Sequence, residues 1–398
     1  MHPPRFALGF TSLLALAAWS GCADPDTPGG AAPGPLLADT AAACASSGPP
    51  LPAAARSDLQ HTLDAIVAGG AAPGAILTLD HPSYRAFSAA SGIADLATGQ
   101  AIDPGDRFRA GSMLKLAVAA ALLQLVEHGE LSLDARLTQL LPPAITSRVA
   151  EAENITLRML LSHTGGVPEP VDAAFHAAVF QDPAKIWTLD DYLTLSAAHP
   201  RPFPPGAGWA YSNMDYILAG EILTAASRAP WRDSVKRVLD RAGLTHSSLP
   251  RPGHAACDGC ARGYEPLAGE LVDLTEVDPS MAGAAGGGAL VTTTADLVRF
   301  LRALLAGALF DRPGTLAIMT GFVDAPLPQE GQTQYGLGLA RFQFGDLELI
   351  GHYGSTAGYN GFVLQDTATG VVFAGSINQD GGLGALVVPV VQAVGRLP

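Results

Sequence analysis

The sequence predicts an α+β protein in which an antiparallel β-sheet flanked by helices carries a mostly helical inserted lobe. Strand-like segments gather near both ends of the folded part, whereas the middle reads as helices joined by loops rich in Pro and Gly. With 398 residues, the chain is longer than one hydrophobic core usually supports, so two lobes are expected. Hydrophobic residues make up 48% of the chain and charged residues 15%, which is enough apolar material for a large interior.

The N-terminal part of the sheet is expected to follow one helix. Apolar residues recur at helical spacing from about Ser57 to Val67 and predict that helix. Strand-like runs follow at residues 75–79 and 84–90, with a turn near Gly92. These segments supply the first two strands of the sheet.

The remaining elements place a helical lobe between the two halves of the sheet. Residues 112–127 are apolar almost all round, which predicts a buried helix, and the inserted lobe covers about residues 131–280. Alternating apolar residues on both sides of Gly345-Asp346 predict a hairpin with a two-residue turn. The other predicted C-terminal elements are a short strand at 289–292, a helix at 294–305, strands at 361–365 and 371–377, and a helix at 383–394.

The N-terminus is typical of an export signal. Residues 1–21 combine an early positive charge with an apolar run too short to span a bilayer, followed by small residues. The next residue, Cys22, resembles the lipidated cysteine of bacterial lipoproteins, although Trp19 stands where Leu is usual; ordinary cleavage is the alternative. Residues 22–55, rich in Pro, Gly and Ala, are interpreted as a disordered tether, and residues 56–398 as the folded domain. The protein is therefore expected in the periplasm or cell envelope, with membrane attachment through a lipid on Cys22.

The charge and the cysteines restrict the classes of partner. A net charge of −14 argues against nucleic acid, because phosphate binding depends on Lys and Arg. Cys257 and Cys260 enclose two residues, and in an exported protein a local disulfide is the simplest interpretation. His254 leaves zinc as the alternative, but one such cysteine pair without a second is a weak metal signal. Cys44 remains without an assigned role.

The first motif with chemical content is Ser112-Met113-Leu114-Lys115. Residues three apart on a helix share a face, so the Ser112 hydroxyl and the Lys115 amine can meet. A hydroxyl becomes a useful nucleophile when a neighbour takes its proton, and burial favours the neutral amine that can do so. Arginine cannot fill this role, and the chain has only three lysines against 20 arginines. The alternative is a Lys that extends its amine to solvent beside a helix-capping Ser.

The second motif is Tyr211-Ser212-Asn213. A phenol near the serine can pass a proton to a leaving group, and the Asn213 amide can both donate to and accept from a substrate amide. Alone, Tyr-x-Asn is a weak signal, because a Tyr and an Asn that cap a helix would look the same.

The third motif, His352-Tyr353-Gly354-Ser355, follows the predicted hairpin strand. A strand edge that carries Gly354 lets a substrate lie against the backbone, where an N–H group can stabilise an oxyanion. His163 also begins a His-x-Gly triplet, but it follows a helix-like segment. We therefore select His352 and interpret His163 as a structural loop histidine bonded to backbone.

Together, Ser-x-x-Lys, Tyr-x-Asn and His-x-Gly in this order resemble the serine β-lactamase and penicillin-binding-protein family from about residue 56 to the end. The pattern is most similar to the D-alanyl-D-alanine carboxypeptidase branch with His in the third motif. Further matching segments are Phe108-Arg109-Ala110-Gly111, Leu160-Leu161-Ser162-His163-Thr164-Gly165-Gly166, Pro205-Gly206, Tyr335-Gly336-Leu337-Gly338-Leu339 and Gly358-Tyr359-Asn360-Gly361.

The resemblance implies a β-lactamase/transpeptidase-like fold and a role for each motif residue. Ser112 would form the acyl-enzyme, Lys115 would act as its base, and Tyr211 would shuttle the proton. Asn213 would hold the substrate amide. The third motif, His352, Gly354 and Ser355, would bind substrate, with the N–H groups of Ser112 and Ser355 as the oxyanion hole. No metal or organic cofactor is implied.

The recognition residues depart from the carboxypeptidase pattern. Such relatives tend to use a hydroxyl where this chain has Tyr353, and an Arg where it has Ala340; Arg341 lies one position later and would point to the opposite face of a strand. A peptidase acting on D-amino-acid peptides remains the first hypothesis. An esterase or class C-like β-lactamase is the second, and a non-catalytic penicillin-binding or scaffold protein is the third. The expected ligands are accordingly small peptides, esters or β-lactams.

Overall fold

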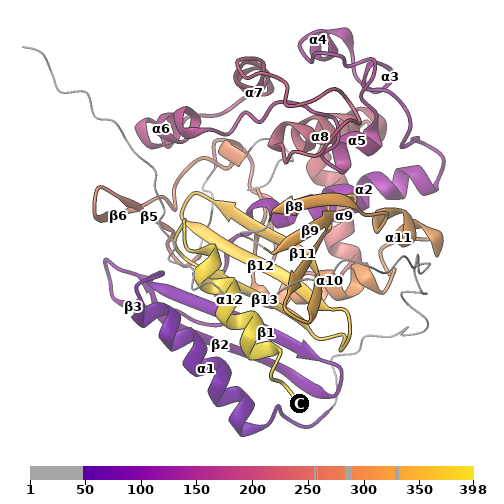
Figure 1. The fold of residues 1–398 in the computed structure, drawn as a ribbon. Helices are drawn as coiled ribbons and strands as arrows, with labels where there is room; N and C mark the ends of the chain where they lie inside the picture. Colours follow the sequence, from indigo (N-terminus) through magenta and orange to yellow (C-terminus); the bar gives the residue numbers. More distant parts are fainter. Residues whose placement is uncertain (1–47, 255–256, 258, 283–288, 328–330) are drawn as a thin grey trace, which may run out of the picture. The chain divides into compact units, whose positions relative to one another are not determined.

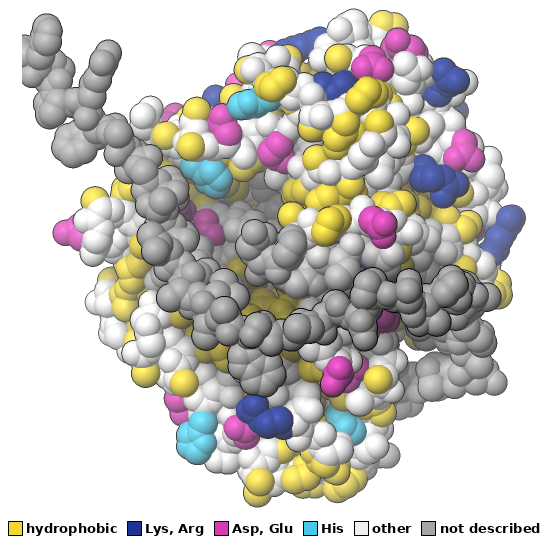
Figure 2. All heavy atoms as spheres, in the orientation of Figure 1, with side chains coloured by type: hydrophobic (Ala, Val, Ile, Leu, Met, Phe, Trp, Pro, Cys, Tyr) yellow, Lys and Arg dark blue, Asp and Glu magenta, His cyan; other side chains and the backbone are white. Residues whose placement is uncertain are grey.

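A computed structural model describes residues 48–254, 257, 259–282, 289–327 and 331–398. The predicted signal peptide, Cys22, Cys44 and most of the tether lie outside these residues. Within the described ranges, no helix is long and apolar enough to cross a membrane. On the face shown in Figure 2, the described Lys and Arg side chains are scattered among acidic ones.

One antiparallel sheet of nine strands, in the order β3-β2-β1-β13-β12-β11-β10-β9-β8, forms the centre of the fold (Figure 1). The N- and C-terminal halves meet where β1 pairs with β13, with Ala75 opposite Ile377. This pairing confirms the prediction of one sheet built from both ends of the folded part. The strands are β1 Gly74–His81, β2 Tyr84–Asp95, β3 Gln100–Ala101, β8 Val323–Leu327, β9 Gln332–Tyr335, β10 Ala340–Phe344, β11 Leu347–Thr356, β12 Tyr359–Asp366 and β13 Val372–Ile377.

Alternation along the strands divides the sheet between two hydrophobic clusters. On β12, Phe362 and Leu364 belong to the cluster that contains α1 (Ala53–Ala68) and α12 (Leu383–Val394). Val363 belongs instead to the cluster that contains α10 (Thr294–Leu305) and the central helices. Successive side chains of a strand point to opposite faces, so each face of the sheet is covered by a different set of helices.

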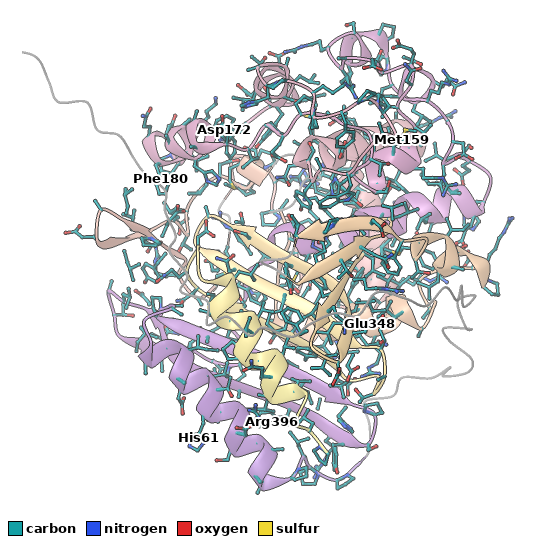
Figure 3. All side chains as sticks on the ribbon, viewed as in Figure 1. His61, Met159, Asp172, Phe180, Glu348 and Arg396 are labelled. Atoms are coloured by element: carbon teal, nitrogen blue, oxygen red, sulfur yellow. A yellow bond between two sulfur atoms is a disulfide. The ribbon has the colours of Figure 1, made fainter. Side chains whose placement is uncertain are left out.

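A polar contact and an ion pair join these layers at particular points. Thr78 of β1 faces α10, and its hydroxyl lies 2.7 Å from that of Thr294. On the other face Arg396, just beyond α12, forms an exposed ion pair of 2.8 Å with Asp58 of α1 (Figure 3).

The helical lobe surrounds α2 (Leu114–Glu127), which is buried along most of its length because its residues are apolar all round. The helices of the inserted lobe are α3 Leu137–Leu140, α4 Pro143–Thr146, α5 Leu157–Leu161, α6 Ala173–Gln181, α7 Leu189–Ala197, α8 Asn213–Ser227 and α9 Trp231–Arg241, and α11 Gly314–Met319 packs against α2 from the C-terminal part of the chain. The remaining short elements of the described chain are β4 Phe108–Arg109, β5 Tyr264–Leu267, β6 Glu270–Asp273, β7 Val291–Thr292, η1 Gly111–Met113 and η2 Pro279–Ala282.

Some element boundaries differ from the sequence-based expectations. Helix α1 begins at Ala53, and Leu51 before it is buried, so the ordered structure reaches into the segment assigned to the tether. Ser112 lies on the 3₁₀ turn η1, and α2 starts two residues later than predicted. Strand β9 was missed because its residues are mostly polar and lack an alternation of apolar side chains, and β8 was missed because it is short and contains Pro326.

Candidate active site

Ser112 occupies a tight turn that packs directly against β11. The preceding Gly111 has a positive φ of 55°, and a Cβ atom there would lie 2.7 Å from the backbone nitrogen of Ser355. A Cβ atom on Gly354 would likewise lie 2.0 Å from the Ala110 carbonyl oxygen. Only glycines permit so close an approach, and it brings the backbone of Ser112 next to that of Ser355.

Two polar side chains converge on the Ser112 hydroxyl. The Lys115 amine donates a hydrogen bond of 3.0 Å to Ser112 Oγ, and the Tyr211 hydroxyl donates one of 2.7 Å to the same atom. The Lys115 ammonium also lies 4.9 Å from the centre of the Tyr211 ring. Residues from η1, α2 and the loop before α8 therefore meet at one oxygen.

Lys115 is fully buried, and burial lowers its pKa to about 7. A negative charge on Glu169, and one on Asp215 when it is ionised, opposes this effect and raises the pKa. Because the free side chain titrates near 10.5, the amine in this site is neutral in a substantial fraction of molecules at neutral pH.

Asn213, the first residue of α8, is held on both sides. Its Oδ1 accepts a hydrogen bond of 2.8 Å from Lys115, and its Nδ2 donates one of 3.2 Å to Glu169 Oε1. The Glu169 carboxylate also accepts bonds from the backbone N–H groups of Asn213 (2.6 Å) and Val171 (2.7 Å). This arrangement fixes the orientation of the Asn213 amide and leaves its second Nδ2 hydrogen for a ligand.

Glu169 is a site residue that the sequence analysis missed. Its carboxyl is largely buried, and burial raises its pKa against the opposing effect of three hydrogen bonds and the Lys115 charge. The only local signal is a charged residue between two prolines, Pro168 and Pro170, after a Gly-Gly pair. No spacing rule connects that pattern to a residue 44 positions away.

The third motif lies where β11 extends beyond its neighbour. The ladder between β10 and β11 ends at the pair Ala340–Gly351, whereas β11 continues to pair with β12 as far as Thr356. Among the described strands, the segment from His352 to Thr356 therefore has one partner, and its other edge lies beside Ser112. This is the strand context that the sequence predicted for the motif.

His352 is buried and uncharged. Its Nδ1–H donates to the Tyr353 carbonyl, so its Nε2 accepts a hydrogen bond of 2.8 Å from the Tyr335 hydroxyl. Burial lowers the pKa of His352 to about 3, and the positive charge of Lys115 contributes to this decrease. His352 thus forms a neutral wall of the site.

The interpretation of His163 as a loop histidine bonded only to backbone was incomplete. Its fully buried Nδ1 lies 2.8 Å from Asp215 Oδ2 and accepts from the Ser212 N–H at 3.3 Å. The ring lies against Tyr211, with centroids 4.4 Å apart. Burial lowers the pKa of His163 and raises that of Asp215, which favours a neutral pair. The local sequence could not identify Asp215, because it is 52 residues away.

A cavity of about 380 Å³ opens beside these residues. Ser112, Tyr211, Asn213 and His352 line it together with Gly354, Ser355 and several apolar side chains. Its volume is that of a site for a small molecule. The structure therefore brings all the catalytic and substrate-binding candidates of the three motifs to one place, with Lys115 buried behind Ser112.

The residues that depart from the carboxypeptidase pattern line the same cavity. Ala340 and Tyr353 both face it, and the Tyr353 ring stacks on that of Phe342 with centroids 4.2 Å apart. Arg341 lies 3.7 Å from Glu348 and packs against Phe322, outside the cavity lining. The arginine next to Ala340 thus contacts other residues, as its position on the strand predicted.

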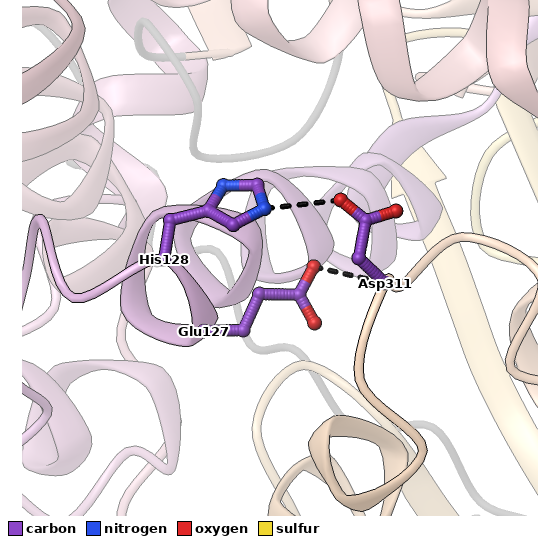
Figure 4. Close-up of side chains that lie close together, drawn as sticks. All are labelled: Glu127, His128 and Asp311. Atoms are coloured by element: carbon purple, nitrogen blue, oxygen red, sulfur yellow. Dashed lines mark hydrogen bonds and ion pairs between the residues drawn. The ribbon is translucent and has the colours of Figure 1, made fainter.

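The described residues offer little support for a metal centre. Cys257 and Cys260 form a disulfide, which removes their thiolates as ligands. Glu127, His128 and Asp311 lie close together in Figure 4, but the oxygens of Glu127 accept hydrogen bonds from two backbone N–H groups and a threonine. That carboxylate serves to hold the loop before α11.

Comparisons with known proteins agree with this geometry. The family model Beta-lactamase matches residues 59–389. Penicillin-binding protein 4 of Amycolatopsis lactamdurans is 26% identical over 72% of this chain and 75% of its own length. Esterase EstB of Burkholderia gladioli is 30% identical, but over only 42% of this chain and 44% of the esterase. A D-stereospecific amidohydrolase from Streptomyces sp. superposes with a TM-score of 0.76 and 28% identity, over 85% of this chain and 98% of the amidohydrolase.

A serine hydrolase is the class that the fold and the cavity define. The family match covers most of the chain, so this protein belongs to the beta-lactamase family of serine hydrolases.

Proposed function

We propose that Ser112 is the acylated nucleophile of a hydrolase that acts on peptides or amides of D-amino acids. The main support is the convergence of the Lys115 amine and the Tyr211 hydroxyl on Ser112 Oγ at a cavity of small-molecule size. The D-stereospecific amidohydrolase among the structural relatives favours D-amino-acid substrates. This choice keeps the peptidase hypothesis while relaxing the demand for a terminal carboxylate.

In the proposed first step, Ser112 Oγ attacks the substrate carbonyl carbon while its proton passes to the neutral Lys115 amine. A pKa of about 7 provides that neutral amine near physiological pH. The negative oxygen that develops on the carbonyl is stabilised by the backbone N–H groups of Ser112 and Ser355.

The second step breaks the bond to the leaving group. The Tyr211 hydroxyl donates its proton to the departing nitrogen and recovers one from the Lys115 ammonium, which leaves an ester on Ser112. Water then attacks this ester, and the acid is released with the proton returned to Ser112. Over a full turnover the group regains its starting protonation, because the leaving group carries away the proton that Ser112 lost and the attacking water replaces it.

An esterase is the second candidate. The cavity wall contains many apolar side chains and no Lys or Arg among the described residues, which suits an uncharged ester. The relation to esterase EstB points the same way but covers less than half of either chain. Esters also react more readily than amides, so this activity is expected even if peptides are the natural substrates.

The test compares the protein with Ser112→Ala on five substrates. These are a labelled penicillin, a chromogenic cephalosporin, a short-chain ester, a D-Ala-D-Ala peptide and a D-amino-acid amide. Fast release from the D-amino-acid substrates, lost in the variant, supports the proposal. Turnover of the ester alone indicates an esterase, and turnover of the cephalosporin indicates a β-lactamase. If none of the five compounds labels the protein and none is hydrolysed, the result would favour a non-catalytic binding protein and overturn the proposal.

We further propose that residues 1–21 direct export and that Cys22 carries a lipid. The support is the sequence pattern alone. Mass spectrometry of the N-terminal peptide from the native host tests it, with Cys22→Ser as the control. A mature chain that still begins at Met1 would contradict export, and an unmodified Cys22 would contradict lipidation.

A further inference from the structure

The cavity has an acidic character that none of the motif residues explains. Among the described residues that line it, Asp380 carries the one formal charge, and Lys and Arg are missing from this wall. The two histidines of the lining are His176 and His352, and His352 stays neutral because burial lowers its pKa to about 3. A ligand in the cavity therefore meets one carboxylate and no matching cation on the described wall.

Asp380 is held in place by the residue that we assign to the oxyanion hole. Its Oδ1 accepts hydrogen bonds from the Ser355 hydroxyl at 2.9 Å, from Asn360 Nδ2 at 2.9 Å and from the Gly381 N–H at 2.8 Å. Among the described residues, no donor bonds its Oδ2. The carboxylate is thus oriented by one oxygen while the other remains available to a ligand.

A second acidic residue, Glu265, lies close enough to Asp380 to be affected by its charge. Burial raises the pKa of Glu265 to about 7, and the negative charge of Asp380 adds to this rise. No Lys or Arg of the described residues forms an ion pair with either carboxyl group. Two neighbouring acids without a protein cation would both be stabilised by a positively charged ligand.

The same wall is unsuited to a carboxylate. Ala340 faces the cavity, while the neighbouring Arg341 is directed to Glu348. A substrate carboxylate near Ser355 would thus approach Asp380 without a compensating charge on the described wall. Like charges in a partly enclosed cavity repel, and this repulsion would weaken binding.

We propose that Asp380 selects substrates that carry a positive charge close to the reacting carbonyl and rejects those that carry a carboxylate there. This proposal rests on the proposed function, because it assigns a substrate class to the same cavity. Ser355, whose N–H we assign to the oxyanion hole, donates its hydroxyl to Asp380, so the carboxylate lies next to the proposed position of the reacting carbonyl. Coulomb attraction over about 5 Å in a half-open site corresponds to roughly a tenfold preference.

The experiment uses two pairs of substrates that match in shape and differ by one permanent charge. For the acyl side, the 4-nitrophenyl ester of 4-(trimethylammonio)butanoate is compared with that of 5,5-dimethylhexanoate. For the leaving-group side, acetylcholine is compared with 3,3-dimethylbutyl acetate. The ratio of kcat/KM within each pair is measured for the parent protein and for Asp380→Asn, which can keep the three hydrogen bonds while it removes the charge.

The matched control is Asp346→Asn, in the turn before β11. This exposed carboxyl lies just before β11, nine residues ahead of Ser355 near the other end of the strand, which places it roughly 25–30 Å away. We expect the parent and the control to prefer the cation roughly tenfold in at least one pair, and Asp380→Asn to reduce that preference to within about twofold. The pair that responds tells on which side of the scissile bond the cation lies.

The outcomes separate this proposal from the proposed function. Ser112-dependent hydrolysis of the neutral esters with no preference for the cation in either pair would overturn the role of Asp380 alone. A preference for the cation that Asp380→Asn retains in full would overturn that role as well. Absence of Ser112-dependent reaction with every ester and amide would instead overturn the proposed function.

Discussion

The two sides of the cavity differ in how closely they follow the family pattern. On one side, Ser112, Lys115 and Tyr211 form a hydrogen-bonded group that matches the motifs. On the other side, Ala340 and Tyr353 replace the residues expected around a carboxylate, and Asp380 adds a negative charge. The difference suggests that the chemistry of acyl transfer is retained while the recognition of the substrate has changed. The following predictions test that separation.

Replacement of the nucleophile has the largest expected effect. Ser112→Ala removes the atom that is acylated, and we expect a loss of about 10⁴–10⁶ in kcat/KM on every substrate. The melting temperature should change by no more than a few degrees, because the hydroxyl is small and only partly buried. Steady-state kinetics and a thermal melt check both statements. If the variant stays active, the nucleophile must be a residue other than Ser112.

Replacement of the base tests the requirement for a neutral amine. Lys115→Arg keeps a positive charge but cannot lose its proton, so we expect kcat to fall by at least about 10³. The buried site must also accommodate a larger group, so circular dichroism has to show that the variant is folded. A folded variant with more than a tenth of the parent's kcat would contradict the role of Lys115.

The pH dependence gives an independent view of the same group. Because the amine must be neutral and its pKa is about 7, kcat/KM should fall about tenfold for each pH unit below 7 and level off above it. A neutral ester is the suitable substrate, since its own charge does not change. A profile that is flat from pH 5 to 8 would rule out Lys115 as the base.

Glu169→Gln tests the residue that holds Asn213 next to Lys115, on the side of the cavity that carries the catalytic group. The Glu169 carboxylate accepts three N–H donors, and an amide in its place would present its own N–H to one or more of them, so the Asn213 side chain should lose its fixed orientation. We expect a decrease of about 10–100-fold in kcat/KM, since buried donors facing each other cost about 1–3 kcal/mol. The acid limb of the pH profile should also move to lower pH, because Glu169 raises the pKa of Lys115. An unshifted limb would show that Glu169 acts through packing alone.

Ala340→Arg addresses the recognition side and should leave the chemistry intact. An arginine at this cavity-lining position would supply a bidentate partner for a carboxylate. We expect the ratio of kcat/KM for D-Ala-D-Ala over its C-terminal amide to rise by about tenfold, with little change for a neutral ester. A thermal melt controls for overpacking at this buried position. Equal losses on all three substrates would mean that the two sides of the cavity are not separable.

Much of the fold was accessible from the sequence, because it depends on local periodicity. The α10 and α12 helices and the β10–β11 hairpin have clear apolar patterns, and each was located to within a few residues. Strands β8 and β9 were not, because β9 is mostly polar and β8 contains Pro326. Both gain their order from pairing, β9 with β10 and β8 with β9. A strand at the edge of a sheet carries a weaker sequence signal than one buried on both faces.

The sequence by itself determined the proposed nucleophile and base, because Ser112 and Lys115 are one helical turn apart and local geometry brings them together. Only the tertiary structure decided which distant residues complete the cavity. Tyr211 meets Ser112 from 99 positions away, and Asp380 reaches Ser355 from the loop after β13. These contacts depend on how strands and helices pack across the sheet, and no short-range periodicity encodes that packing.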